Sequence, residues 1–402
     1  MDLRKRLARL DRLTRKPEPV RPGPTAVRGG AAPDGDVVTS MRALGLESTL
    51  TPAGTLWWRE DRREGVPRPP GPIPDLEGIL PAGTPDGLTW DDVLFLDTET
   101  TGLAGGTGTL PFLLGLAWWD GEEFVVRQLF LEGPGREAPI LADLAGLARR
   151  FRVVATYNGA SFDLPLVRTR ALLCRTENPV ADLVSWDLLP GARRLWGRGL
   201  ENCKQQTIEL EVCSRERGPG DIPGALIPAV YQDFVRTMDL GLLPAVLRHN
   251  RRDMDGMGLI LSQLAAAAET IEPVPDNISW SWVEAWSRAL ICERRRRRIP
   301  AAEWARHIVP SVTVESVPLL CVLDAIRLLK RVEAWTSVGD LVQHGLSRFP
   351  GDSRLSYEGA VLYEHRLEDL DRALEHAEVL GDPHRLARLR SRLGIVESSK
   401  SD

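Results

Sequence analysis

Apolar residues near the middle of the chain follow a pattern that predicts a β-sheet. The run Val-Leu-Phe-Leu at residues 93–96 is uninterrupted, which is typical of a strand buried on both faces of a sheet. Asp120-Gly121 separates two further apolar runs and predicts a hairpin turn. The expected strands are 93–97, 112–118, 124–131 and 152–157, with a helix at 138–150 before the last one. This order of elements favours an α/β fold.

Proline and glycine divide the rest of the chain into regions. Both residues recur through residues 1–80, which favours a partly disordered leader with room for one small ordered element around Gly54–Arg59. The α/β pattern covers residues 81–270, and Pro273-Val-Pro275 then marks a linker. Residues 278–400 have amphipathic helical spacing throughout, so we expect an all-α second domain.

The last helices resemble a degenerate tetratricopeptide repeat. Within residues 353–390, Gly359 lies in one predicted helix, and Ala373 and Ala377 lie in the next. A single repeat cannot bury its apolar face alone, so the helices between residues 282 and 349 would complete the stack. A protein partner could bind such a helical domain.

Composition and charge narrow the class of protein. The chain has 402 residues and a formal net charge of -5, so a nucleic acid would have to meet a local basic surface. Its five cysteines include no C-x-x-C pair, which argues against a disulfide framework or zinc site and favours a reducing compartment. No apolar run is long enough to cross a bilayer, and the arginine-rich start lacks the apolar core of a secretory signal. We therefore expect a cytoplasmic protein that does not bind membranes.

Two acidic residues close the first predicted strand. Asp97 and Glu99 are separated by one residue, and because side chains alternate along a strand they should lie on the same side of the sheet. Neighbouring carboxylates repel each other unless a positive group lies between them, and a divalent metal ion is a common solution. The alternative is a strand that simply ends in charged loop residues.

Further polar candidates follow later in the chain. Asp163 comes shortly after the strand at 152–157, where a helix would begin, so it could instead be an ordinary helix N-cap. His249 and Asp253 lie one helical turn apart on the inward face of a helix predicted over residues 242–267. A buried carboxylate is costly unless it is paired or binds a metal. A salt bridge for Asp253 and a hydrogen-bonded core histidine for His249 are the alternatives.

These motifs together resemble a known superfamily. Asp97-Thr-Glu99, Asn158-Gly-Ala-Ser-Phe-Asp163 and His249-x-x-x-Asp253 resemble, in order, the three exonuclease motifs of the DEDD superfamily of ribonuclease H-like nucleases. More narrowly, residues 90–268 resemble the YprB-type family of predicted exonucleases, through phrases such as Asp221-Ile-Pro-Gly. The resemblance implies a ribonuclease H-like mixed sheet flanked by helices, ahead of the tetratricopeptide-like all-α domain.

The resemblance also implies a two-metal phosphodiesterase. Two Mg²⁺ or Mn²⁺ ions would be bound by Asp97, Glu99, Asp163 and Asp253. His249 would be the general base or would orient the attacking water. Only three residues separate it from the final acid, which is the spacing of members that carry tyrosine, whereas members with histidine usually have four. Asp187, in Trp-Asp-Leu-Leu, would support the site from behind or cap a helix.

Several residues are candidates for binding the substrate. Thr98, Asn158 and Phe162 lie within the motifs themselves. Arginines that cluster in sequence near the predicted site could hold phosphates, although exposed arginines are also commonly just solvated; the candidates are Arg168, Arg194 and Arg198. The run Arg294–Arg298 in the helical region could bind nucleic acid or an acidic partner, or form a solvated face.

The leading hypothesis is a metal-dependent nuclease that removes nucleotides from single-stranded DNA or RNA with a free 3′ end. One alternative is a nucleic-acid-binding or scaffold protein whose nuclease fold no longer turns over. Another is a structure-specific endonuclease on the same fold. No short motif distinguishes DNA from RNA, since that choice depends on contacts with the 2′-hydroxyl group.

Overall fold

The protein is described by a computed structural model that covers nine stretches of the chain, namely residues 35–63, 65–76, 79–80, 85–102, 108–197, 199–218, 220–269, 280–314 and 317–395. These residues form two compact units. Unit 1 contains the described residues up to Leu76 together with Leu80–Gly191 and Lys204–Ala265. Unit 2 contains Ile79, Ala192–Cys203 and the described residues from Ala266 onward. The predicted linker at Pro273–Pro275 lies outside the described residues.

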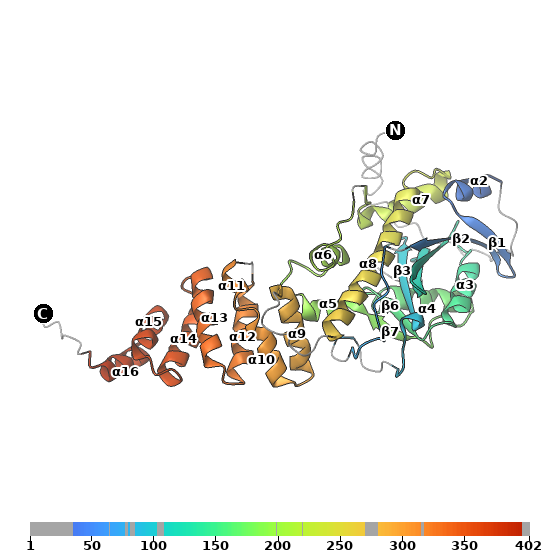
Figure 1. Cartoon of the computed structure of the whole chain (residues 1–402). Helices are drawn as coiled ribbons and strands as arrows, with labels where there is room; N and C mark the ends of the chain where they lie inside the picture. Colours follow the sequence, from blue (N-terminus) through green and yellow to red (C-terminus); the bar gives the residue numbers. More distant parts are fainter. Residues whose placement is uncertain are drawn as a thin grey trace. The chain divides into compact units, whose positions relative to one another are not determined.

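Unit 1 is built around one mixed sheet of seven strands (Figure 1). The first five strands in space are antiparallel to their neighbours, and the last two run parallel to the strand that precedes them. In spatial order the strands are β1 (Glu47–Thr51), β2 (Gly54–Arg63), β5 (Glu123–Phe130), β4 (Pro111–Asp120), β3 (Val93–Thr100), β6 (Val153–Thr156) and β7 (Val184–Asp187). The mixed α/β sheet expected from the sequence is confirmed.

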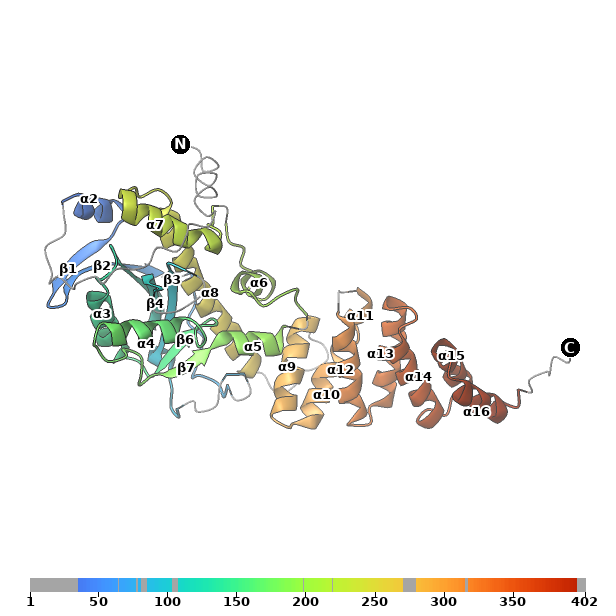
Figure 2. The same ribbon diagram turned by 180° about the vertical axis from the view of Figure 1, so that it is seen from behind.

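Helices cover both faces of this sheet. The long helix α8 (Leu243–Glu269) crosses one face, and α3 (Ala138–Ala148) and α4 (Asp163–Leu173) lie over the other, as Figures 1 and 2 show from opposite sides. Because both faces are covered, the apolar half of β3 is fully buried. The remaining helices of this part of the chain are α2 (Gly35–Ala43), η1 (Trp90–Asp92), α5 (Leu188–Leu195), α6 (Gln205–Glu211), η2 (Gly224–Leu226) and α7 (Ile227–Thr237).

The segment expected to belong to a leader contributes to this sheet. Strand β2 pairs with β5 along seven residues, from Trp57 opposite Phe130 to Arg63 opposite Phe124. Trp57 is 1% exposed and packs in the same core as Met41 of α2. The edge of a sheet offers unsatisfied backbone groups that a distant strand can pair with, and the local proline and glycine content does not report that pairing. Residues 1–34 lie outside the described part of the chain.

Unit 2 is helical from Trp282 onward, as expected. Its core contains Trp286 and Trp304, and both are nearly completely buried. Ser281 and Glu284 form a capping box that begins the first helix. The helices are α9 (Trp282–Arg294), α10 (Arg298–Arg306), α11 (Ser311–Val314), α12 (Leu319–Lys330), α13 (Trp335–Arg348), α14 (Ser353–His365), α15 (Leu370–Leu380) and α16 (Pro383–Leu393).

The small residues singled out in the sequence lie at a helix–helix contact. A Cβ added to Gly359 of α14 would lie 2.7 Å from the Nε2 atom of His376 on α15. Ala373 and Ala377 of α15 are both fully buried. The likeness to a tetratricopeptide repeat stays a prediction, whereas the close contact of small residues between these two helices is observed. Among the residues that the structure describes, no helix has the length and apolar character needed to span a membrane.

Candidate active site

Strand β3 brings Asp97 and Glu99 to the end of the sheet, facing α8. Asp97 lies opposite Gly115 of β4 in the antiparallel register. The amide of Asn250, which is fully buried on α8, donates from Nδ2 to the Oδ2 atom of Asp97 over 2.8 Å. Asn250 in turn accepts from Gln128 of β5 over 2.7 Å. A chain of buried amides therefore fixes the orientation of the Asp97 carboxylate.

Gly115 makes this contact between sheet and helix possible. A Cβ at this position would lie 2.5 Å from the Oδ1 atom of Asn250 and 2.8 Å from the sulfur of Met254. Such distances are far below normal van der Waals contact, so only glycine lets α8 approach β4 this closely. The close approach places the acids of β3 beside those of α8.

Asp163 is held at the start of α4 by a neighbouring strand. The hydroxyl of Thr98 on β3 donates a short hydrogen bond to the Oδ1 atom of Asp163. The loop before Asp163 turns through Asn158, whose φ of 67° is a left-handed conformation that asparagine tolerates better than most residues. Asp163 is the first residue of α4, whose N-cap is Phe162, so the alternative of an ordinary N-cap is wrong. Its side chain is buried, with 8% of the residue exposed.

Asp187 forms hydrogen bonds with that loop. Its carboxylate accepts hydrogen bonds from the backbone N–H of Asn158 over 2.8 Å and of Ala160 over 3.3 Å. It also accepts from the N–H of Leu189 over 3.0 Å, in the first turn of α5. Asp187 thus ties the loop before Asp163 to the end of β7 and caps a helix at the same time.

His249 and Asp253 complete the cluster from α8. The Nε2 atom of His249 lies 3.2 Å from the Oδ2 atom of Asp253, one helical turn away. Glu99 joins them, and one potential ligand atom from each of the three residues lies within 4.8 Å of the others. The three sequence motifs therefore meet at one place in unit 1.

Burial and mutual repulsion make the charged form of these acids costly. Burial raises the pKa of Asp97 well above its usual range, and the nearby Asp163 and Asp253 raise it further. The pKa of Glu99 is raised well above its usual range for the same reasons, with Asp97 the largest charged contributor. Burial raises the pKa of Asp163 to about 6 despite the hydrogen bond from Thr98. Carboxylates in such surroundings become charged readily only when protons are replaced by another cation.

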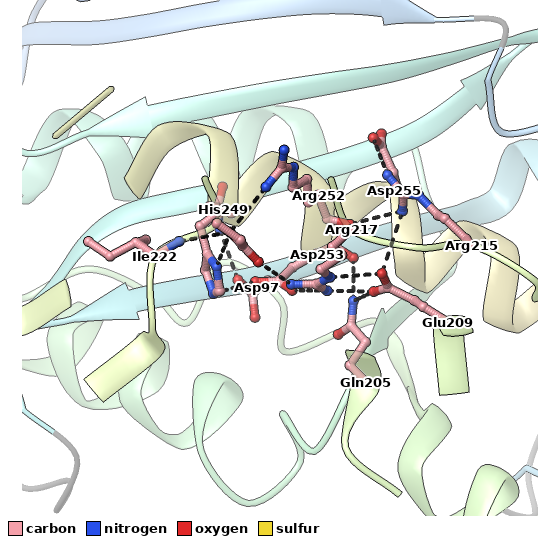
Figure 3. A network of polar contacts seen from close by, with 12 residues as sticks. Asp97, Gln205, Glu209, Arg215, Arg217, Ile222, His249, Arg252, Asp253 and Asp255 are labelled. Carbon is pink, nitrogen blue, oxygen red and sulfur yellow. Dashed lines mark hydrogen bonds and ion pairs between the residues drawn. The ribbon is translucent and has the colours of Figure 1, made fainter. Parts of the chain in front are cut away.

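A partly buried arginine, not anticipated from the sequence, contacts the cluster (Figure 3). The Nη2 atom of Arg217 lies 2.5 Å from the Oδ1 atom of Asp253. The same guanidinium donates to both oxygens of Glu209, which is completely buried. Burial alone would lower the pKa of Arg217, but its bonds with Glu209 and Asp253 have the larger effect and raise the pKa above its usual range. The guanidinium group therefore stays charged. Asp253 is therefore paired through both of its oxygens.

Asp221 holds the other side of the histidine. Its Oδ1 atom lies 2.9 Å from the Nδ1 atom of His249, so the imidazole bridges two carboxylates. Burial alone would raise the pKa of Asp221, but the bond with His249 and the charges of Arg217 and Arg252 lower it. The phrase Asp221-Ile-Pro-Gly was the only sequence signal for this residue.

A hollow of about 540 Å³ opens beside the acids. The side chain of Phe162 is 55% exposed at this place. The walls of this hollow contain Asp97, Thr98, Asn158, Phe162 and Asp163. The three motif residues expected to touch the substrate thus lie together with two of the acids.

The structure does not place the described candidate arginines, Arg168 and Arg194, in the walls of this hollow. Arg168 is exposed on α4, outside the described lining of this hollow. Arg194 belongs to unit 2, where its Nη1 atom donates to the backbone oxygen of Ile79 over 2.9 Å. Arg198 lies outside the described residues. Phosphate binding by these three arginines remains a prediction.

Comparison with known proteins agrees with this geometry. A family model described as the RNase H superfamily matches residues 94–265, which contain all the acids of the cluster. The uncharacterized protein YprB of Bacillus subtilis (strain 168) is 38% identical over 175 residues, which make up 43% of this chain and 41% of YprB. The match thus spans less than half of either protein. The expected resemblance to a YprB-type, ribonuclease H-like family is confirmed for this part of the chain.

Proposed function

We infer that the chain, whose residues 94–265 belong to the RNase H superfamily, is a metal-dependent nuclease acting on single-stranded nucleic acid. We further propose that it removes nucleotides from a 3′ end. The observation that supports this best is the meeting of four acids from three separate elements, Asp97 and Glu99 on β3, Asp163 on α4 and Asp253 on α8. Clustered carboxylates of this kind can bind divalent cations, and such cations can catalyse the hydrolysis of phosphodiester bonds.

The donor set fits hard divalent cations. Carboxylate oxygens are the ligands that Mg²⁺ and Mn²⁺ prefer. The pKa values of Asp97 and Asp163 are raised, so a nearby cation would stabilise the charged form of both carboxylates. We propose that Asp97, Glu99, Asp163 and Asp253 hold two such ions. When bound, the ions would supply activation of a water molecule and stabilisation of the leaving 3′ oxygen.

Residues of the chain itself would position the acids and the substrate. Asn250 fixes Asp97, and Thr98 fixes Asp163, so neither carboxylate has to be ordered at the moment of reaction. The hollow beside them would take the terminal nucleotide, with the exposed ring of Phe162 available for stacking on a base. His249 is the proposed proton acceptor. Because both of its nitrogens lie next to carboxylates, one of these contacts must open before water can reach the ring.

The nuclease proposal predicts that activity depends on Asp97. The full-length chain should shorten a 5′-labelled single strand in the presence of Mn²⁺ or Mg²⁺ and release mononucleotides. Asp97→Asn should lower the rate by about a hundredfold or more, because it removes a proposed metal ligand with little change in shape. Glu122→Gln, at an exposed position of the β4–β5 turn, is the matched control and should digest like wild type.

The products of this assay also test the mode of attack. Fragments from internal cuts would contradict removal from a 3′ end while keeping metal-dependent hydrolysis. Undiminished digestion by Asp97→Asn would defeat the whole assignment. Chelation of divalent cations should stop wild-type digestion.

One observation favours a second candidate function. Arg217 already supplies a positive charge to Asp253, so part of the acidic cluster is neutralised without any metal ion. A protein that binds strands without cutting them could keep the fold in this way. Metal-independent binding with no cleavage across varied strands would support this candidate, whereas loss of activity in Asp97→Asn supports the nuclease.

A further inference from the structure

Unit 2 carries a hollowed surface that the proposed catalytic chemistry does not use. Two hollows of about 770 Å³ and 500 Å³ share Arg331 in their walls. The first lies between α12 and α14, and the second lies between the turn that follows α9, the start of α10 and the end of α12. We name the two together the basic groove. Its cationic residues are Arg296, Arg298, Arg327, Lys330, Arg331 and Arg354.

Positive charge predominates in the basic groove. Two carboxylates, Glu293 and Glu358, lie in its walls against the six cationic side chains. Glu293 is shared between Arg327, at 2.6 Å, and Arg331, at 2.9 Å. Glu358 pairs with Lys330 at 2.7 Å, and Asp324 lies 3.4 Å from Arg327. Even with these acids counted, the cations of the groove outnumber the carboxylates beside them, so this part of an acidic protein attracts anions.

The most accessible cations of the basic groove lie at its two ends. Arg296 and Arg298 are exposed and belong to the arginine run that the sequence singled out. At the other end, the side chain of Arg354 is 55% exposed and lies 2.9 Å from Asp352. Pairs this exposed contribute little stability, so their arginines can exchange partners at low cost.

An aromatic ring lies among these charges. Tyr357 of α14 lines the basic groove and is 52% exposed, and the guanidinium of Arg385 lies 5.4 Å from its ring centroid. A chain of carboxylates would need only the cations. An exposed ring beside a row of cations fits a single nucleic-acid strand better, because phosphates meet the cations while a base stacks on the ring.

We propose that the basic groove binds the sugar–phosphate backbone of single-stranded nucleic acid and so forms a second strand-binding site. The inference rests on the proposed function for its substrate class. It assigns the helical unit the task of holding the strand, separately from the residues that would cut it.

The test measures strand binding without cleavage. The full-length chain, with divalent cations chelated, is titrated against a fluorescent oligo-deoxythymidine at several salt concentrations. Arg296→Glu combined with Arg298→Glu should weaken binding about tenfold or more, and the slope of log K against log salt should fall by about 1.4 because two phosphate contacts are lost. Arg354→Glu, on a different helix, should weaken binding in the same direction.

The controls separate this site from the proposed catalytic one. Arg306→Glu changes the charge of an exposed arginine at the other end of α10 and should bind like wild type. Equal binding by wild type and the Arg296/Arg298 variant would overturn the basic groove as a strand site, whatever the cleavage assay shows. Equally tight binding of a poly-glutamate peptide would overturn its assignment to nucleic acid. The wild-type chain could bind the strand more tightly than the Arg296/Arg298 variant and yet show no cleavage with Mn²⁺. That result would support the basic groove as a strand site and would contradict only the nuclease assignment.

Discussion

At the scale of single residues, the site consists of acids whose pKa values are raised by burial and by one another's charge. Asp163 has a pKa of about 6 in the folded chain, above the value of about 3.8 to 3.9 expected when the chain is unfolded. Between those values the folded chain binds more protons than the unfolded chain, so its stability falls as pH rises. For Asp97 and Glu99, whose pKa values are raised further, this loss continues toward neutral pH.

This arrangement predicts an unusual pH dependence. With divalent cations chelated, lowering the pH from about 7.5 to about 5.5 should raise the midpoint of thermal unfolding by a few degrees. Addition of Mn²⁺ at the higher pH should also raise it, because a ligand bound only by the folded state stabilises that state. Differential scanning calorimetry checks both effects. The same dependence on pH in an Asp97→Asn/Asp163→Asn variant would show that other groups cause it.

Some residues of the site could be predicted from the sequence around them, and others could not. Asp97, Glu99, Asp163 and Asp253 follow a recognisable order along the chain, and the structure brings them together. Arg217 and Glu209 lack such a pattern, because their importance comes from burial against α8. Asn250 directly follows His249 in the sequence, yet only its contact with Asp97 reveals what it does.

At the scale of elements, the distance between β4 and α8 decides whether the acids can meet. Strand β4 presents Gly115 where α8 presents Asn250 and Met254. The periodicity of each element was evident from its sequence, with strands expected at 93–97 and 112–118 and a helix over 242–267. How closely the two would approach depended on one missing side chain, which the periodicity does not encode.

Gly115→Ala should therefore destabilise unit 1 and disturb the site together. We expect a cost of about 1–3 kcal/mol in the free energy of unfolding, since the added methyl group must displace a buried amide or sulfur atom. Urea denaturation measures this cost, and calorimetric titration with Mn²⁺ measures the accompanying loss of metal affinity. Gly133→Ala is the matched control, because a Cβ at that position meets no atom within 4 Å. Equal stability of the two variants would contradict the close packing of α8 on β4.

At the scale of the whole molecule, the boundary between the units does not follow the order of the sequence. Residues Ala192–Cys203 lie well before the predicted linker, yet they belong to unit 2. A Cβ on Gly199 would lie 2.0 Å from the Cη2 atom of Trp282, so this segment packs tightly against the first helix of that unit. A protein truncated at the predicted linker would lack Trp282 and therefore this packing.

Trp282→Ala tests this organisation. Removal of a buried indole should cost about 3–5 kcal/mol in unit 2 and loosen the segment that packs on it. Limited trypsin digestion should then cut faster after Arg193 or Arg194 than in wild type. Trp335→Ala removes a partly buried indole elsewhere in the same core and should leave those sites protected. Equal protection in the Trp282 variant would contradict the assignment of Ala192–Cys203 to unit 2.

Local patterns in the sequence predicted strands β3, β4, β5 and β6, helices α3 and α8 and the helical character of the C-terminal part, and they singled out the candidate acids. These properties depend on local periodicity and on a short ordered pattern of residue types. Strand β7 was not among the expected strands. The extension of the sheet by β1 and β2, the contacts of Arg217 with Asp253 and of Asp221 with His249, and the place of Ala192–Cys203 in unit 2 became evident from the folded chain. Each of these depends on contacts between residues far apart in the chain, and such contacts are selected by burial and close packing, which local patterns do not specify.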